Sequence, residues 1–213
     1  MPRPTSRSKT PRPSTATVAT RQRILEVART HFFNSGYSAL ILDELARELG
    51  ISKKTLYRYF SGKEALVGEI IDAFAREVRT AADALFADGT LSYPVKTRRF
   101  VQTMMGRLGT LSPHVIRDLQ RYAPALFRKV EQLRTTNIPH IFGELIRQGQ
   151  VAGLVRADIK PQFAIEFWLP AIQNLMHPDT LYRLRLTPEQ VFEQAIGIYF
   201  NGLLTPDGRE EYE

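Results

Sequence analysis

Three lysines lie at positions where a helix on its own disfavours positive charge. Ser52 has the residue type of a helix N-cap, which places Lys53 and Lys54 in the first turn of the helix that follows. The S-x-x-E pattern that begins at Ser61 predicts a capping box, which places Lys63 in the first turn of the next helix. The first turn is the positive end of the helix dipole, so each lysine there is unfavourable by roughly a few tenths of a kcal/mol. A bound phosphate reverses this preference, because the backbone amides and the lysines then attract the same anion.

The segment 43–60, which carries the first two of these lysines, predicts two short helices joined by a tight turn. Leu45 and Leu49 fall on one face of the first helix, and Gly50 is the residue type that commonly ends a helix. Leu56 in the second helix then faces back toward the first. This is the layout of a helix-turn-helix, whose second helix enters the DNA major groove. The alternative interpretation is a solvated charged surface without a partner.

The positive charge is concentrated at one end of the chain. Residues 1–60 hold 11 Lys and Arg against 4 Asp and Glu, whereas residues 61–213 hold 18 of each class. The formal net charge of +7 therefore falls entirely on the first 60 residues. Such an asymmetry is typical of a nucleic-acid-binding end attached to a neutral body. An anionic membrane could also attract it, but the basic residues are spread over a compact helical unit and do not form one amphipathic stripe.

Length and composition exclude several classes of protein. A chain of 213 residues has room for one or two domains with a substantial core, and it contains no Cys, which excludes disulfides, thiolate catalysis and Cys-ligated zinc. No apolar run reaches the roughly 18 residues of a membrane span, and the N-terminus has no apolar signal core. We therefore expect a cytoplasmic protein without a membrane partner.

No motif in the chain predicts catalysis or a cofactor. There is no G-x-S-x-G nucleophile motif and no G-x-x-x-x-G-K phosphate loop. His114, His140 and His177 lie far apart without H-x-x-x-H spacing, and we expect them to be polar residues of the body rather than metal ligands. The prediction is a protein that is not an enzyme, with no catalytic residues, no cofactor and no metal. A catalytic pair assembled only in space stays open at this point.

Helical spacing of apolar residues dominates the chain, and no segment shows the sustained period-2 alternation of a strand, so we expect an all-α fold. Residues 1–20 are rich in Pro, Ser, Thr and basic residues and predict a disordered basic arm, which either solubilises the chain or adds non-specific DNA affinity. The predicted helices cover about 21–34, 42–49, 53–59, 63–87, 93–108, a segment begun by Ser112-Pro113, 124 to 149–153 interrupted at Pro139, 161–176 with Pro170 inside, and 188–204, begun by a Thr187–Gln190 capping box.

A group of residues at fixed spacing lies within residues 21–68. It consists of Arg23-Ile24-Leu25, Ala28, Phe32, Gly36-Tyr37, Leu45-Ala46, Gly50-Ile51-Ser52-Lys53, Thr55-Leu56-Tyr57, Phe60 and Lys63-Glu64-Ala65-Leu66. Together these residues resemble the N-terminal signature of the TetR (tetracycline-repressor) family of bacterial transcriptional regulators. The resemblance implies a three-helix helix-turn-helix DNA-binding domain over 21–66 and a helical ligand-binding and dimerisation domain over 67–213. It also implies a homodimer that binds a palindromic double-stranded DNA operator and releases it when a small molecule binds.

The resemblance also implies roles for individual residues. At the start of the second helix of the motif, Lys53, Lys54 and Thr55 resemble base-contacting positions, and Tyr57, Tyr59 and Lys63 resemble phosphate-contacting ones; Arg21 is a further expected DNA contact. The chain departs from the family at Leu40 and Ile41, where Thr or Ser is frequent, and at Lys54, where Gly is frequent. Lysine can donate to guanine O6 and N7, so Lys54 predicts a distinct base preference.

The C-terminal body is rich in aromatic and Met residues, which form either an ordinary core or the wall of an apolar cavity for a small hydrophobic effector. We place that cavity near Pro139 and Pro170, because a proline inside a helix removes a hydrogen bond and splays the helix. The helix over 63–87 is expected to link cavity and DNA. The predicted ligand-binding residues are Phe100, Met104, Tyr122, Phe142, Trp168 and Gln173.

The last two long helices offer wide apolar surfaces, and we expect them to form the homodimer interface through Phe167, Ala171, Leu175, Phe192, Ile196 and Tyr199. A ligand-independent architectural or constitutive DNA-binding protein is the alternative function. A well-formed apolar cavity favours a ligand-responsive regulator, whereas a solid core favours the alternative.

Overall fold

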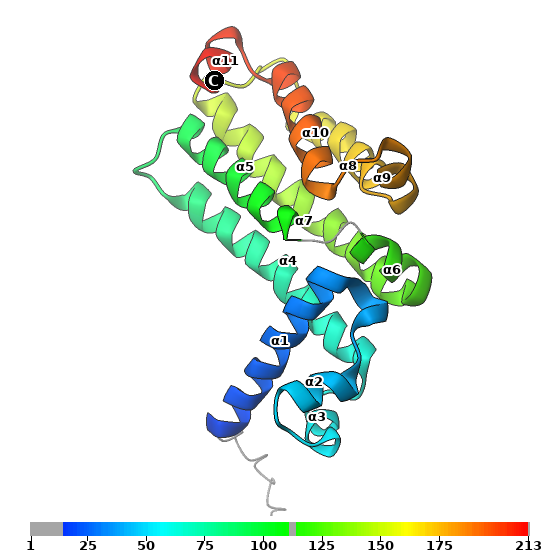
Figure 1. The fold of residues 1–213 in the computed structure, drawn as a ribbon. Coiled ribbons are helices and arrows are strands. Elements are labelled where there is room, and N and C mark those ends of the chain that lie inside the picture. Colours follow the sequence, from blue (N-terminus) through cyan, green and yellow to red (C-terminus); the bar gives the residue numbers. More distant parts are fainter. Residues whose placement is uncertain (1–14, 111–113, 213) are drawn as a thin grey trace, which may run out of the picture.

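The computed structural model describes residues 15–110 and 114–212, and this part of the chain consists of helices without strands, as predicted. The helices are α1 (Thr15–Ala39), α2 (Leu42–Glu48), α3 (Lys53–Tyr59), α4 (Lys63–Ala87), α5 (Tyr93–Gly109), α6 (His114–Tyr122), α7 (Pro124–Val151), α8 (Pro161–Leu175), α9 (Pro178–Leu184), α10 (Pro188–Leu203) and α11 (Pro206–Tyr212). Helices α1 to α3 lie at one end of the molecule, whereas α5 and α8 to α11 lie at the other (Figure 1).

Two hydrophobic cores occupy the two ends. The first is built from α1, α2, α3, the beginning of α4, and side chains of α6 and α7 such as Leu119 and Leu126. The second joins the end of α4 to α5, α7, α8 and α10 and contains Phe142, Trp168 and Tyr199. The first core therefore extends beyond residue 66, where we expected the DNA-binding domain to end.

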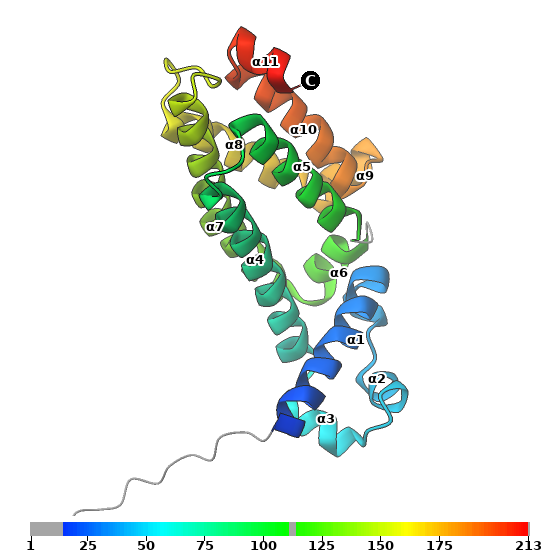
Figure 2. The same cartoon turned by 90° about the vertical axis from the view of Figure 1, so that its left-hand side faces the viewer.

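Helix α4 belongs to both cores and connects the ends of the molecule (Figure 2). Leu66 and Ile70 in its first half are almost completely buried against α1 to α3, and Ala82 and Phe86 near its end are buried in the second core. A helix of 25 residues is ~38 Å long. Polar contacts with α7 fix it along this length, because Lys129 donates to Asp72 at 2.6 Å and His140 lies 2.6 Å from Asp83.

Most predicted helix boundaries are confirmed, and the caps explain why. Ser52 begins α3 and accepts a hydrogen bond from the backbone N–H of Thr55, and Thr187 and Gln190 form the predicted capping box of α10. The capping box predicted at Ser61 and Glu64 is wrong. The N-cap of α4 is Gly62, whose backbone is extended, and no side chain caps the helix there.

The prolines and the ends of the chain account for the other differences. Helix α7 runs through Pro139 without the predicted interruption, and Pro170 also lies inside its helix. The predicted disordered arm is wrong for residues 15–20, which are the first turns of α1; the rest of the arm and the predicted cap at Ser112-Pro113 lie outside the described residues. The short helices α9 and α11 were not predicted; each has Pro as its first residue.

Helix α1 bends at Gly36, and this bend brings α6 into contact with the end formed by α1 to α3, which we call the DNA-binding end after the predicted helix-turn-helix. Gly36 has φ 87° and ψ −179°, a backbone conformation that is essentially restricted to glycine. A side chain at this position would place its Cβ 2.6 Å from the Asp118 carboxylate of α6. That carboxylate accepts hydrogen bonds from the backbone N–H of Ser38 at 2.8 Å and from its hydroxyl at 2.6 Å. The bend therefore requires glycine for both its backbone and its neighbour.

We expect Gly36→Ala to lower the free energy of unfolding by ~1–3 kcal/mol, because the backbone becomes strained and Asp118 has to move. Gly106→Ala is the matched control, since Gly106 lies inside α5 with open space beside it, and alanine there should stabilise by ~0.5–1 kcal/mol. Urea denaturation of the two variants measures both values. A stabilising Gly36→Ala would contradict the assigned strain.

Candidate functional site

The α2–α3 pair has the geometry of a helix-turn-helix. Gly50 ends α2 with φ 65°, and the backbone N–H of Ile51 donates to the carbonyl of Ala46 at 3.0 Å, which closes the turn. Leu45 and Leu56 are 2% and 0% exposed, so the apolar faces of the two helices are packed into the first core. The opposite face of α3 is left at the surface, at the end of the molecule away from the C-terminal helices (Figure 1).

The two lysines at the start of α3 have different surroundings. Lys53 forms an ion pair with Asp43 of α2, which offsets the unfavourable dipole at this helix end. Lys54 is exposed and makes no ion pair within the described residues. Lys54 is therefore the cation of α3 that a DNA base or phosphate can engage without breaking an existing contact.

The remaining predicted contacts on α3 are partly used by the fold. The Thr55 hydroxyl lies 2.9 Å from the hydroxyl of Ser52 within the helix cap, whereas Tyr57 is 50% exposed. Tyr59 is half-buried and lies under the guanidinium of Arg58, 5.2 Å from the ring centroid. At the start of α2, Ile41 is the N-cap residue and supplies no side-chain hydrogen bond, as its aliphatic type requires.

Lys63 is held by the bend at the end of α1. Its ammonium lies 4.3 Å from the ring centroid of Tyr37 and donates to the carbonyl of Ser38 at 3.3 Å. Burial lowers the pKa of Lys63, and the nearby Asp118 carboxylate opposes this shift. Lys63, Ser38 and Asp118 thus connect α4, α1 and α6 at one point.

Arg21 is also engaged within the fold. It forms an ion pair with Glu69 of α4, and its guanidinium lies 5.0 Å from the ring centroid of Phe60. Its side chain is 41% exposed, so a DNA phosphate can still approach it.

An apolar cavity of about 200 Å³ lies between the two cores. Its wall includes Phe32 and Phe33 of α1 at the DNA-binding end, and Phe100 of α5 and Trp168 of α8 at the opposite end. Aromatic contacts support the wall at α8, where the ring centroid of Trp168 is 5.1 Å from that of Phe142. The cavity is large enough for a small molecule, since a cavity of ~150 Å³ already holds benzene.

The predicted ligand-binding residues divide into two groups. Four of them line the cavity: Phe100, Met104, Phe142 and Trp168. Pro139 and Pro170 do not line it themselves, but nearby residues on α7 and α8 do. Tyr122 and Gln173 are not in its wall; the Tyr122 side chain is 51% exposed at the end of α6. These two residues are corrections to the predicted site.

Helix α6 faces the cavity on one side and the DNA-binding end on another. Val115, Ile116 and Leu119 line the cavity, whereas the carboxylate of Asp118 accepts hydrogen bonds from Ser38 of α1. Helix α4 contacts the cavity as well, through Ile71, which packs in the first core. The cavity is therefore connected to the DNA-binding end through α6 in addition to the predicted link through α4.

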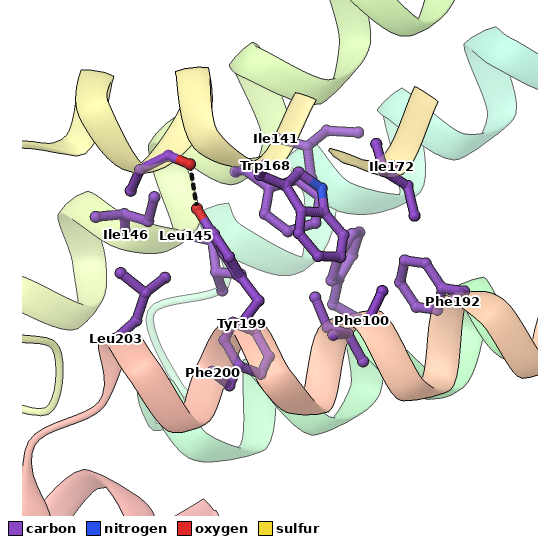
Figure 3. Close-up of a cluster of buried hydrophobic side chains, with 14 of the residues drawn as sticks. Phe100, Ile141, Leu145, Ile146, Trp168, Ile172, Phe192, Tyr199, Phe200 and Leu203 are labelled. Atoms are coloured by element: carbon purple, nitrogen blue, oxygen red, sulfur yellow. Dashed lines mark hydrogen bonds between the residues drawn. The ribbon is translucent and has the colours of Figure 1, made fainter. Parts of the chain in front are cut away.

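The predicted dimer face is partly incorrect. Phe167 of α8 is 63% exposed, but Phe192, Ile196 and Tyr199 of α10 are buried in the core of their own chain. Figure 3 shows Tyr199 inside this core, where its hydroxyl donates to the carbonyl of Ala164 at 2.9 Å. Ala171 and Leu175 are half-buried. The large exposed apolar side chains of these two helices, apart from Pro170, are instead Phe163, Phe167 and Ile198.

Comparison with known proteins identifies the family. The family described as "Bacterial regulatory proteins, tetR family" matches residues 24–70, which include the whole helix-turn-helix. Residues 24–70 are a DNA-binding domain of the TetR family.

Relatives match most of the length of this chain. The HTH-type transcriptional regulator YvaF of Bacillus subtilis is 21% identical, over 85% of this chain and 94% of its own length. The HTH-type transcriptional repressor DhaR of Mycobacterium sp. (strain GP1) is 23% identical over 86% and 92%. The crystal structure of a TetR-family regulator from Agrobacterium tumefaciens has the same fold, with a TM-score of 0.66, 13% identity, and coverage of 89% of this chain and 100% of that one.

Two residues of the candidate site, Asp118 and Arg134, were not predicted from the sequence. Asp118 lies 80 residues from Ser38, and Arg134 of the cavity wall lies in a helix rich in charged residues. Neither carried a local signal, because the place of Arg134 in the cavity wall and the contact of Asp118 with Ser38 both depend on how distant segments pack. Among the described residues no helix is both long and apolar enough to cross a membrane.

We expect Lys54→Ala to relax discrimination at one base position of the bound DNA by ~1–3 kcal/mol, because Lys54 is exposed at the start of α3 and free to donate to a base edge. Lys160→Ala is the control, since Lys160 is an equally exposed lysine before α8 in the C-terminal body. Competition titrations on duplexes that vary one base pair at a time measure the effect. Unchanged discrimination at every position would remove Lys54 from base recognition.

Proposed function

We propose that this TetR-family chain is a transcriptional repressor that binds a palindromic operator as a homodimer and is released by a small hydrophobic effector. One observation carries the proposal: α6 lines the cavity, and its Asp118 also holds the bend of α1 by accepting hydrogen bonds from Ser38. An occupant that displaces α6 has to move Asp118, and with it the segment that positions Lys63. The apolar cavity favours this function over a constitutive DNA-binding protein, whose core needs no such space.

The geometry of the operator supports sensitivity to small movements. Two recognition helices of a dimer must lie one DNA turn apart, ~34–36 Å, to reach both half-sites of a palindrome. A shift of a few ångströms at the start of α4, where Lys63 contacts α1, changes this separation. Coupling between effector and operator is reciprocal, so the operator should lower the affinity for the effector by the same factor.

The coupling predicts a specific phenotype for Asp118→Ala. In the unaltered protein a compound that stabilises the chain in a thermal-shift screen should also weaken operator binding, by ~5–150-fold for ordinary allosteric coupling. Asp118→Ala should keep the affinity for the compound but lose most of this factor, because α6 no longer holds Ser38. Calorimetry with the compound and fluorescence anisotropy with the operator measure the two affinities.

Arg117→Ala is the control for this experiment, because Arg117 is an exposed neighbour on α6 that contacts His114 and not the DNA-binding end. It should retain full coupling. An unaltered protein whose stabilising compounds leave operator affinity unchanged would refute release by an effector, and full coupling in Asp118→Ala would refute the route through α6.

The dimer of the proposed repressor is expected to form through the exposed sides of α8 and α10. Phe163, Phe167 and Ile198 are 67%, 63% and 76% exposed, and Gly197 and Gly202 on α10 have open space where a side chain would lie. Small residues of this kind let two helices approach closely across an interface. Large apolar side chains at the surface are typical of association sites.

We expect Ile198→Arg to abolish the dimer at micromolar concentration and to weaken operator binding about tenfold or more, because a charge is then buried at the interface. Since Ile198 is exposed in the single chain, the substitution leaves the core intact. Tyr182→Arg is the control, as Tyr182 is 78% exposed on α9. Sedimentation equilibrium gives the result, and a dimeric Ile198→Arg variant would argue against this face.

A further inference from the structure

The wall of the cavity contains two polar side chains among the described residues, and both come from α7. Arg134 and Asn137 lie one helical turn apart, and every other lining side chain is apolar apart from the indole N–H of Trp168. Asn137 is already used by the fold, since its side-chain N–H donates to the carbonyl of Ala75 in α4 at 3.0 Å. Arg134 is therefore the group that can give the cavity a polar end.

The guanidinium of Arg134 retains donors for a ligand. Its Nη1 donates to Glu131 at 2.6 Å, and a guanidinium carries five N–H donors in a fixed planar fork. The Arg134 side chain is only 20% exposed, and burial lowers its pKa although Glu131 opposes the shift. A partly buried cation with spare donors gains from an oxygen acceptor that enters the cavity.

The charge balance of this pair selects the kind of acceptor. Arg134 and Glu131 together are neutral, so a second carboxylate would leave a net negative charge beside an apolar wall, which is costly. A neutral carbonyl oxygen accepts the same hydrogen bond and leaves the pair balanced. The volume of about 200 Å³ accommodates a molecule somewhat larger than benzene.

We infer that the effector is a small apolar carbonyl compound, such as a ketone or ester of about eight non-hydrogen atoms, whose oxygen accepts a hydrogen bond from Arg134 while its hydrocarbon part fills the space toward Phe100 and Trp168. The inference rests on the proposed function, because it takes the cavity as the effector site.

The chain contains its own reporter for this binding. Trp168 is the single tryptophan, it is 2% exposed, and it lines the cavity. Figure 3 shows its indole beside Ile172 and Phe100, which also line the cavity. Its fluorescence, excited where tyrosine does not absorb, reports whether the cavity is occupied and requires no DNA.

The test compares 2-heptanone, heptanoate and n-heptane, which share a hydrocarbon chain and differ in the terminal group. In the unaltered full-length chain we expect 2-heptanone to change Trp168 fluorescence at about tenfold lower concentration than n-heptane, and heptanoate to bind more weakly than the ketone. In Arg134→Met the two compounds should act at nearly the same concentration, because the ketone loses its hydrogen bond while n-heptane still binds. Glu131→Gln should strengthen heptanoate about tenfold, because the charge of Arg134 is no longer balanced.

Arg147→Met and Glu144→Gln are the matched controls, since this pair has the same spacing on α7 and does not line the cavity. Both should behave as the unaltered chain. Thermal unfolding shows that each variant is folded, and Arg134→Lys, which keeps the charge but loses the planar fork, should retain part of the ketone preference.

Equal binding of 2-heptanone and n-heptane, or a ketone preference that survives Arg134→Met, would overturn the assignment of Arg134. Tighter binding of heptanoate than of 2-heptanone would show that the site prefers an anion to a neutral carbonyl compound. An unchanged Trp168 signal with all three compounds would overturn the assigned size of the ligand. A compound that binds with the expected preference but leaves operator affinity unchanged would refute the proposed repressor function and leave the ligand assignment standing.

Discussion

The contact of Asp118 with the bend of α1 is the constraint on which the arrangement of the two ends depends. A single carboxylate oxygen accepts two hydrogen bonds from Ser38, and it can do so only because Gly36 has no side chain. The carbonyl of the same Ser38 holds the ammonium of Lys63 at the start of α4. The position of α4 relative to α1, and therefore of the DNA-binding end relative to the body, is set where three helices meet.

The DNA-binding end illustrates how function and folding share residues. The first core packs the apolar faces of α2 and α3 tightly, with Leu56 fully buried, so that the exposed side of α3 is presented on a rigid support. Lys53 is balanced by Asp43, whereas Lys54 keeps its charge exposed at a helix end where folding alone prefers an acidic residue. The DNA-binding end thus retains a local electrostatic cost that an anionic partner removes.

The sequence was sufficient for features that depend on local chemistry. The bounds of α3 follow from its Ser52 cap, and the turn at Gly50 follows from glycine and apolar spacing; the structure confirms both. The bounds of α4 are also as predicted, although the predicted capping box at its start is absent. The sequence was insufficient where both faces of one helix carry large apolar residues and either face could enter the core. Helix α10 is apolar on the side of Ile196 and Tyr199 and also carries Ile198 on its exposed side, and periodicity does not tell which face enters the core. The cavity wall was partly predictable from aromatic residues, but the roles of Arg134 and Asp118 were not, because the packing of the whole fold decides which helices meet at the cavity and at the bend of α1.

The empty space between the two cores has a consequence for how such a chain can evolve. The wall of a cavity of about 200 Å³ forgoes packing contacts that a solid core would make, and such contacts contribute to the stability of a domain. Substitutions that enlarge Ala75 or Val78 in its wall would recover part of this loss and would also remove the room for an effector. Selection for robustness and selection for responsiveness therefore act in opposite directions on the same few side chains. A lineage that no longer needs to sense its effector is free to close this space and to become a more stable protein.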